Sequence, residues 1–329
     1  MSNKEKFYGI NDSNWGHKWG YKDSGFKINN DKSVTFTGKR YPICGKRLYN
    51  FVPFVEEILG VEFAIEPKIK EVEKKHVSEP NINEPFMADL RKLFSADRFS
   101  GEHNERLLHS HGQHSTDEVY KVLYNQLEQF TDLVFYIESE EETVKLIDLA
   151  EKHNVCLIPY GGGTNVTNAL RPPKGEKRMV VSVDTRRMSA VESVDEQNLM
   201  VTVEAGITGK VLEQELNKIG FTVGHEPDSY EFSTVGGWIS TNAAGMKKHK
   251  YGNIEDIVQN LRMVTPKGVI NQKRPLTRSS FGIKTQNILF GSEGNLGIIT
   301  SATLKVHRLP ESSAYESIIF KDWDTGVHF

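Results

Sequence analysis

A run of three glycines constrains the fold of this 329-residue chain more than any other feature. Gly161, Gly162 and Gly163 directly follow the apolar stretch Val155 to Pro159, which predicts a buried strand that ends in a tight loop. Glycine backbones reach positive φ and can turn successive N–H groups toward a phosphate, with no side chain in the way. No Gly-Lys-Ser/Thr follows, as in a Walker A loop, and the GxGxxG spacing is absent. On these residues alone, a phosphate-binding loop and a plain glycine-rich turn remain equally good interpretations.

Strand and helix patterns alternate from residue 128 to 309, which indicates an α+β domain with mixed sheets. Ser139 followed by Glu142 predicts a helix that begins with a capping box. A second helix is predicted over residues 211–219, because Gly220 can end it. Apolar and polar residues alternate from 302 to 306, which predicts a half-buried strand. Further buried strands are predicted at residues 133–137, 155–159, 179–183 and 199–204.

The composition excludes several classes of protein. The net charge of −3 argues against a surface that binds nucleic acid as a whole. The two cysteines, Cys44 and Cys156, form no CxxC pair, so we expect neither a disulfide framework nor a zinc site. No apolar run approaches the roughly 20 residues that span a bilayer. The charged N-terminus does not resemble a secretory signal, and the last three residues are not the Ser-Lys-Leu peroxisomal address.

Three more segments have the small residues that a bound ligand requires. Hydroxyls in Asp228–Gly237 precede a glycine pair, which suits a pyrophosphate at a helix start. Ser240–Gly245 contains small residues that leave room for a planar ring. Gly291–Thr300 holds three glycines within seven residues and predicts a close backbone approach to a ligand. Each segment alone also fits tight structural packing, but four in one domain favour a composite ligand site.

The combined pattern of these four segments resembles the vanillyl-alcohol-oxidase/p-cresol-methylhydroxylase flavoproteins. Within that group the chain is similar to the alkylglycerone-phosphate synthases, also called alkyl-dihydroxyacetonephosphate synthases. The stretches that carry this closer resemblance are residues 203–209, 225–238, 245–248 and 251–256, with 19–21, 37–42 and His111-Gly112 upstream.

The resemblance implies an α+β, two-subdomain FAD-binding domain of the vanillyl-alcohol-oxidase (PCMH) type with an N-terminal, partly helical extension. We expect the extension over residues 1–127, the FAD-binding domain over 128–309, and the start of a truncated substrate or cap domain over 310–329. FAD is expected to bind noncovalently. By resemblance its contacts fall on Pro159, Tyr160, Gly161, Gly162, Gly163, Thr164, Asn165, Asp228, Ser229, Tyr230, Glu231, Phe232, Ser233, Thr234, Thr241, Asn242, Ala243, Ala244, Glu293, Gly294, Asn295, Leu296, Gly297, Ile298 and Ile299.

The resemblance also implies an activity. Such an enzyme exchanges the acyl chain of acyl-dihydroxyacetone phosphate for a long-chain fatty alcohol in ether-lipid biosynthesis, through an adduct at the flavin N5 and without net redox. It further implies a homodimer, peripheral membrane association and a peroxisomal location. The family's catalytic residues lie beyond the flavin domain, so none is assigned in this chain. The alternatives are an FAD-dependent 2-hydroxy-acid oxidoreductase of the D-lactate type and a non-catalytic, truncated FAD-binding module.

Histidines provide the remaining candidates for a site. The spacing of His109, His111 and His114 does not place them on one helical face, so we predict surface or packing histidines and no metal site. His225 is interpreted as a polar residue near the flavin, with a plain turn residue as the alternative. Cys156, in a predicted buried strand, is expected to pack as a small hydrophobe.

Overall fold

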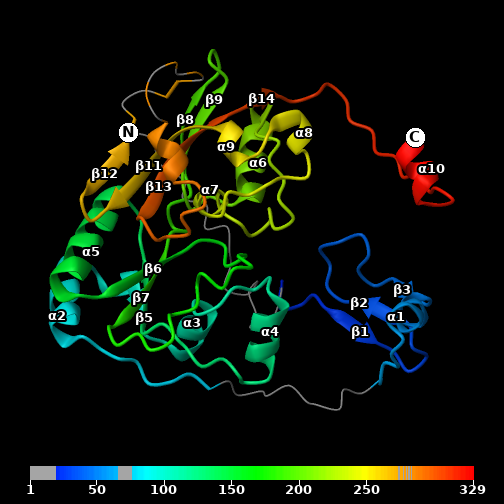
Figure 1. The fold of residues 1–329 in the computed structure, drawn as a ribbon, viewed down its shortest axis with the longest axis horizontal. Coiled ribbons are helices and arrows are strands. Elements are labelled where there is room, and N and C mark those ends of the chain that lie inside the picture. The colour runs from blue at the N-terminus through cyan, green and yellow to red at the C-terminus, as the bar shows by residue number, and fades with distance from the viewer. Residues whose placement is uncertain are drawn as a thin grey trace.

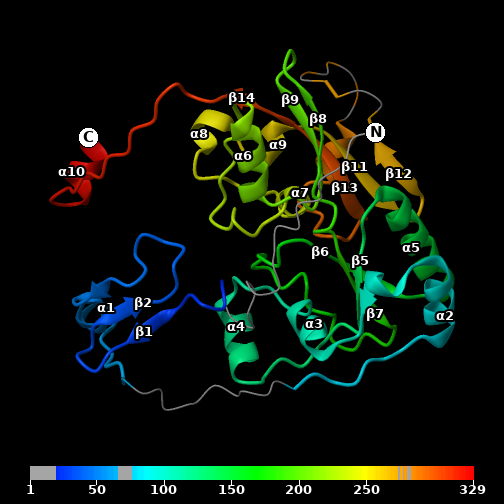
Figure 2. The same ribbon diagram turned by 180° about the vertical axis from the view of Figure 1, so that it is seen from behind.

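The computed structural model describes residues 20–65, 76–272 and 284–329, together with 275, 276, 278, 280 and 282. Figure 1 and the opposite view in Figure 2 show a main body built on two sheets, a small N-terminal unit beside it, and an extended C-terminal segment that leaves the body. Residues 1–19 and 66–75 of the predicted extension lie outside the described residues.

The first sheet has the strand order β4-β5-β7-β6. Its strands are β4 (Phe99–Ser100), β5 (Leu133–Tyr136), β6 (Cys156–Tyr160) and β7 (Val180–Asp184). β5, β7 and β6 run parallel, and β4 joins antiparallel. Helices α2 (Glu84–Leu93) and α5 (Glu140–His153) share one apolar core with this sheet. Parallel strands end at the same edge of a sheet, so the loops that follow β6 and β7 lie together.

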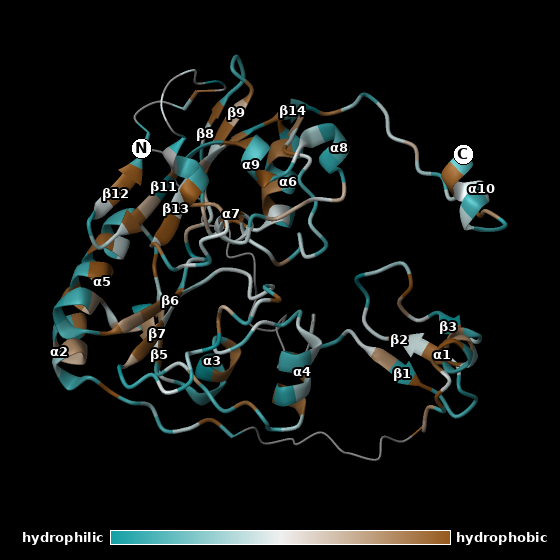
Figure 3. Cartoon of the chain, in the orientation of Figure 1, coloured by the Kyte–Doolittle hydropathy of each residue, from teal (hydrophilic) through white to brown (hydrophobic). Residues whose placement is uncertain are grey.

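The second sheet is antiparallel, with the order β12-β11-β13-β9-β8. Its strands are β8 (Val191–Asp195), β9 (Met200–Glu204), β11 (Val258–Thr265), β12 (Gly268–Asn271) and β13 (Ile298–Lys305). Residues of α6 (Gly209–Lys218), α7 (Val235–Ser240) and α9 (Ile254–Ile257) complete a second apolar core around the buried Trp238. In Figure 3 the strands β5, β7 and β13 are mostly brown, in keeping with these two cores.

Glu140, in the first turn of α5, connects the two sheets. Its carboxylate accepts hydrogen bonds from Arg262 Nε on β11 at 2.8 Å and from Thr300 Oγ1 on β13 at 2.7 Å. These bonds neutralise part of the Arg262 charge and fix α5 against the second sheet. The two subdomains are therefore joined by directed contacts as well as by apolar packing.

The remaining elements lie at the edges of this body. The N-terminal unit contains β1 (Phe26–Ile28), β2 (Val34–Phe36), β3 (Arg47–Leu48) and α1 (Phe51–Leu59). The other elements are η1 (Ala96–Arg98), α3 (His103–Leu108), α4 (Thr116–Leu123), β10 (Phe221–Thr222), α8 (Lys248–Tyr251), η2 (Thr285–Ile288), β14 (His307–Arg308) and α10 (Trp323–His328). In the part of the chain that is described, no helix combines the length and the apolar character needed to cross a bilayer.

The predicted α+β class is confirmed, and β5, β7, β9, α5 and α6 form within one or two residues of their predicted bounds. The predicted domain boundaries stay predictions. One observation bears on the first of them, because β4, at residues 99 and 100, pairs with β5 in the first sheet. Part of the extension is thus continuous with the main body.

Three local predictions were wrong in detail. Ser139 Oγ does accept from Glu142 N–H, but the Glu142 carboxylate bonds to the N–H of Glu138, so the capping box is only half formed. Strand β6 was predicted to be buried, yet its first four residues are only half-buried because β6 lies at the edge of its sheet. Edge positions also tolerate Pro159, which cannot donate to a ladder.

The predicted half-buried strand, β13, is instead buried on both faces except at Lys305. It lies between β11 and β9, and its polar Thr303 is satisfied by a hydrogen bond to Thr202 at 2.9 Å. A threonine that is paired across a sheet costs little to bury, which the alternating pattern alone does not reveal.

Candidate functional site

The four segments singled out in the sequence surround one cavity of about 430 Å³. This size lies in the range of small-molecule and cofactor sites. Most of the predicted contact residues line it, namely Pro159, Tyr160, Gly161, Gly162, Gly163, Thr164, Asn165, Ser229, Ser233, Thr234, Thr241, Asn242, Ala243, Ala244, Glu293, Gly294, Gly297, Ile298 and Ile299. The walls come from both subdomains, because the loop after β6 faces α7 and the start of β13.

The glycine loop contributes backbone N–H groups. Among the described residues, the N–H groups of Gly161, Gly162 and Gly163 have no hydrogen-bond acceptor. Neighbouring free N–H groups of this kind attract an anion, since each contributes a fixed positive partial charge. Of the three glycines only Gly163 has a positive φ, of 66°. The loop therefore suits a phosphate group.

Gly161 and Gly162 are required for a different reason from the one predicted. A Cβ on Gly162 would overlap the carbonyl group of Phe232, and one on Gly161 would meet the Thr234 hydroxyl. The two glycines thus let the loop pack directly onto the neighbouring wall at residues 232–234. Close approach of two backbones, rather than an unusual φ, excludes side chains at these two positions.

The first three backbone N–H groups of α7 all have acceptors. The N–H of Val235 bonds to Ile207 O at 3.0 Å, and the N–H of Gly236 bonds to Ala205 O at 2.7 Å. The third N–H, of Gly237, is accepted by the Thr234 hydroxyl oxygen at 3.2 Å. The backbone N–H groups at this helix start are therefore already bonded, and whether a phosphate lies there stays a prediction that depends on the hydroxyl groups. The wall contributes the hydroxyl groups of Ser229 and Thr234 to the cavity lining instead.

Asn165 has the features of a ligand contact. Its side chain lines the cavity, and both of its amide atoms are buried without a partner among the described residues. An unpaired buried amide costs roughly 1–3 kcal/mol, so a polar ligand that pairs with it would bind favourably. Of the cavity-lining side chains in the described part of the chain, Glu293 alone is charged. An anion in this cavity would therefore be held by uncharged groups, such as the backbone N–H groups of the glycine loop and the Asn165 amide.

Two hydrogen-bonded connections hold the walls together. Thr167 Oγ1 donates to Glu293 Oε1 at 2.5 Å, which joins the glycine-loop segment to the segment before β13. The N–H of Glu293 donates to Ser240 O at 2.9 Å, which joins that same segment to the end of α7. Around these contacts, residues 241–244 present only small side chains, which leaves space for a flat group.

Six predicted contact residues do not line the cavity: Asp228, Tyr230, Glu231, Phe232, Asn295 and Leu296. The Glu231 carboxylate turns away and accepts hydrogen bonds from Tyr41 Oη at 2.8 Å and Lys210 Nζ at 3.0 Å. Burial, together with this bond to Glu231, raises the pKa of Tyr41. Asn295 and Leu296 line a neighbouring hollow on the other side of Pro159. In the segments 228–234 and 293–299, some residues therefore line the cavity while their neighbours point away from it.

Eleven residues that line the cavity were not among the predicted contacts: Val166, Thr167, Ala169, Leu170, Thr185, Pro227, Gly236, Gly237, Trp238, Ser240 and Gly291. Most of them directly extend a predicted segment. Thr185 is different, because it follows β7. Its inclusion was foreseeable from the parallel strands β6 and β7, whose carboxyl ends meet at one edge.

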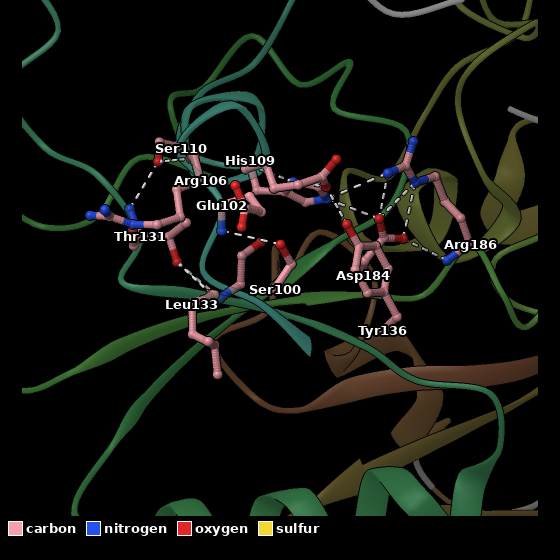
Figure 4. A network of polar contacts seen from close by, with 12 residues as sticks. Ser100, Glu102, Arg106, His109, Ser110, Thr131, Leu133, Tyr136, Asp184 and Arg186 are labelled. Atoms are coloured by element: carbon pink, nitrogen blue, oxygen red, sulfur yellow. Dashed lines mark hydrogen bonds and ion pairs between the residues drawn. The ribbon is translucent and has the colours of Figure 1, made fainter. Parts of the chain in front are cut away.

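A buried polar network, shown in Figure 4, contacts Tyr160 at the beginning of the glycine loop. The Asp184 carboxylate, at the end of β7, pairs with the Arg186 guanidinium and lies 2.9 Å from His109 Nε2. Burial acts to raise the pKa of Asp184, but the Arg186 charge and the His109 contact outweigh it and hold this pKa below its usual range. Arg186 and His109 in turn flank the buried ring of Tyr160, at 5.2 Å and 4.4 Å from its centre.

The histidines are packing residues rather than surface ones. His109 and His111 are fully buried, and His225 is 1% exposed. His225 does not line the cavity; it packs edge-on against Trp238, which does, with ring centres 4.8 Å apart. The described residues contain no group of three or more His, Cys, Asp or Glu side chains arranged to hold a metal ion. Cys156 is half-buried, and burial raises the pKa of its thiol.

Comparison with known proteins indicates which cofactor this chain binds. Residues 131–272 match the family described as FAD binding domain. The alkyldihydroxyacetonephosphate synthase of Caenorhabditis elegans is 42% identical over 311 residues, which cover 94% of this chain and 52% of that protein. A solved structure of an alkyldihydroxyacetonephosphate synthase superimposes with a TM-score of 0.80 at 32% identity, covering 93% of this chain and 56% of the other.

Similarity to other flavoproteins is weaker. The mitochondrial D-lactate dehydrogenase of Arabidopsis thaliana is 28% identical over 68% of this chain. The chain thus contains an FAD-binding domain, its cofactor is FAD, and it resembles the alkyldihydroxyacetonephosphate synthases along nearly its whole length. It spans about half the length of the curated relatives it matches.

Proposed function

We propose that this chain is the FAD-holding part of an alkyldihydroxyacetonephosphate synthase. Such an enzyme would convert acyl-dihydroxyacetone phosphate and a long-chain fatty alcohol into alkyl-dihydroxyacetone phosphate and a free fatty acid. The observation that carries the proposal is the 42% identity over 94% of the chain, which includes all four walls of the cavity. A D-lactate-type oxidoreductase has weaker support, because its identity is lower and covers less of the chain.

We propose a role for each wall of the cavity. The free N–H groups of Gly161 to Gly163 would donate to the pyrophosphate, and the Asn165 amide would pair with a polar group of the dinucleotide. The small side chains of residues 241–244 would leave space for the flavin ring. A Cβ added at Gly297 would overlap residues 263–265 of β11. Glycine at this position therefore lets the wall that precedes β13 pack directly against β11. Bound FAD would supply the reactive ring at which the acyl chain is exchanged for the alkyl chain, without net redox.

The remaining chemistry requires groups that we do not assign to the described residues. A substrate phosphate requires a cation, and the described cavity lining contains none. We therefore propose that this chain's residues bind and orient FAD, while the substrate-binding residues lie in the part of the relatives that this chain does not match.

Assembly and location are proposed from the resemblance alone. A homodimer, peripheral association with a membrane and a peroxisomal location in ether-lipid biosynthesis would accompany this activity. The exposed Met246 and the neighbouring Lys247 and Lys248 provide apolar and basic groups that a membrane surface could contact. Sedimentation at several protein concentrations would test the dimer, and flotation with anionic vesicles would test the membrane contact.

The decisive test compares two substrates. A chimera would join residues 1–309 to the C-terminal part of the Caenorhabditis elegans relative, and would be loaded with FAD. We expect it to incorporate labelled hexadecanol into alkyl-dihydroxyacetone phosphate and to release fatty acid. Oxidation of D-lactate with an electron acceptor, without hexadecanol incorporation, would instead support the oxidoreductase. Tight FAD binding with neither reaction would support a non-catalytic module.

A further inference from the structure

The N-terminal extension contacts the glycine loop directly. The N–H of Gln113 donates to the carbonyl oxygen of Gly163 at 2.7 Å, across 50 residues of sequence. Beside it, a Cβ on Gly112 would lie 2.6 Å from the carbonyl oxygen of Asn165 and 2.8 Å from its side-chain oxygen. These backbones therefore touch, and only a glycine fits at position 112 without moving the loop.

The same part of the extension also holds the beginning of the loop. The His109 ring packs on the Tyr160 ring, with centres 4.4 Å apart, and the His109 Nε2 atom lies 2.9 Å from Asp184. The Tyr160 ring lies under Gly163, because a Cβ there would overlap the phenol oxygen. The extension thus supports Tyr160, Gly163 and Asn165, which lie at the beginning, middle and end of the loop.

These contacts are firmly anchored. Arg106, at the end of α3, donates to Thr131 O at 2.8 Å and to Ser78 O at 2.7 Å (Figure 4). Ser110 Oγ accepts the N–H of Thr131 at 2.8 Å, so α3 is fixed to the start of β5. Hydrogen bonds to a charged group are among the strongest in proteins, and Arg106 is 4% exposed.

A buried carboxylate completes the support. Glu118, on α4, is fully buried and accepts the N–H of Gly112 at 3.0 Å. Its other oxygen lies 3.3 Å from the guanidinium of Arg171, which belongs to the segment that leaves the glycine loop. Burial raises the pKa of Glu118, and the Arg171 charge opposes this shift. The carboxylate therefore connects Gly112 to the segment that follows Asn165.

We infer that residues 109–118 are a positioning element of the cofactor site: they set the direction of the Gly161–Gly163 N–H groups and of the Asn165 amide. The inference rests on the proposal that this loop holds the FAD pyrophosphate. Hydrogen bonds weaken steeply as their angle departs from linearity, so a displaced loop keeps its fold but binds the pyrophosphate poorly. The extension is then part of the cofactor site without touching the cofactor.

The test uses Gly112→Ala, with Gly101→Ala as the matched control in the same extension. A Cβ on Gly101 would meet nothing within 4 Å, and neither glycine has a positive φ. We expect the Kd for FAD of Gly112→Ala to rise by about tenfold or more, as for one impaired hydrogen bond to a charged group, while Gly101→Ala stays near the native value. The melting temperature of each FAD-free protein is measured in parallel, and we expect it to change little in both.

A second pair of variants, Glu118→Ala and Glu118→Gln, tests the inference if Gly112→Ala does not fold. Glu118→Ala removes the acceptor of the Gly112 N–H, whereas Glu118→Gln retains an acceptor, so we expect the Gln variant to recover most of the FAD affinity that the Ala variant loses. Equal FAD affinity in the native chain, Gly112→Ala and Glu118→Ala would overturn the inference and leave the proposed FAD site intact. A native chain that binds no FAD would instead overturn the proposed function.

Discussion

Gly162 lies where two walls of the cavity that we propose for FAD touch. A side chain there would overlap the carbonyl group of Phe232, which is backbone and cannot move aside cheaply. Gly162→Val therefore has to displace the loop that carries the free N–H groups, at a strain of about 1–3 kcal/mol. We expect FAD affinity to fall by about tenfold or more in a titration of flavin fluorescence, while the far-ultraviolet circular dichroism stays native.

Gly101→Val provides the comparison for this substitution. Its surroundings are open, so the same change of residue type is expected to leave FAD affinity near the native value. If Gly162→Val retained full FAD affinity, the loop would have no part in the cofactor site.

The buried side chain of His225 makes the stability of the folded chain depend on pH. Burial lowers the pKa of His225 from 6.5 to about 4, and neither ring nitrogen has a partner among the described residues. Between these pH values the unfolded chain binds the proton and the folded chain does not. The contribution of His225 is therefore present above pH 6.5 and is lost as the pH falls toward 4. The loss is on the order of 3 kcal/mol.

Chemical denaturation of the native chain and of His225→Phe at pH 7 and pH 4.5 isolates this contribution. We expect the native chain to lose more free energy of unfolding than the variant over this interval, because phenylalanine does not titrate. Equal losses in the two proteins would mean that His225 is not buried in its neutral form.

At the scale of elements, α5 depends on its first turn. Ser139 Oγ accepts the N–H of Glu142 at 3.2 Å, and the Glu142 carboxylate is committed to Glu138. Because no reciprocal bond supports the cap, the serine hydroxyl alone satisfies that donor. Ser139→Ala is expected to lower the free energy of unfolding by about 1 kcal/mol.

The exposed Ser193 on β8 serves as the control for this cap. The Ser193 side chain has no hydrogen-bond partner among the described residues, so Ser193→Ala is expected to change stability by less than about 0.5 kcal/mol. Urea denaturation of both variants measures the difference. A Ser139→Ala protein as stable as the control would show that the helix start is satisfied by water.

The elements show what a sequence pattern can predict. Apolar periodicity located α5 and α6 because an amphipathic helix follows from the residues of one segment alone. The exposure of β6 and the burial of β13 depend on which strands lie beside them, and that arrangement is determined by distant parts of the chain. The capping box failed for a similar reason, since the backbone of Glu138 competes for the Glu142 carboxylate.

At the scale of the whole molecule, the four cavity walls could be predicted because each requires small residues in one short segment. The sequence did not reveal which donors are free, because Ile207 and Ala205 occupy the first N–H groups of α7. It also did not reveal that Gly112 and Gln113 support the glycine loop, since no local pattern connects residues so far apart. The free N–H groups and the position of the glycine loop depend on contacts between distant segments, which the sequence of each segment does not show.

The central claim is that this chain binds FAD noncovalently in the cavity between its two subdomains. The most direct measurement is to saturate the purified chain with FAD, remove the excess, denature the protein and filter it. We expect roughly one FAD per chain, recovered as free flavin in the filtrate with its blue absorbance, since the interactions proposed for the cofactor are hydrogen bonds and packing. Flavin that stays with the denatured polypeptide, or a native chain that retains none, would contradict it.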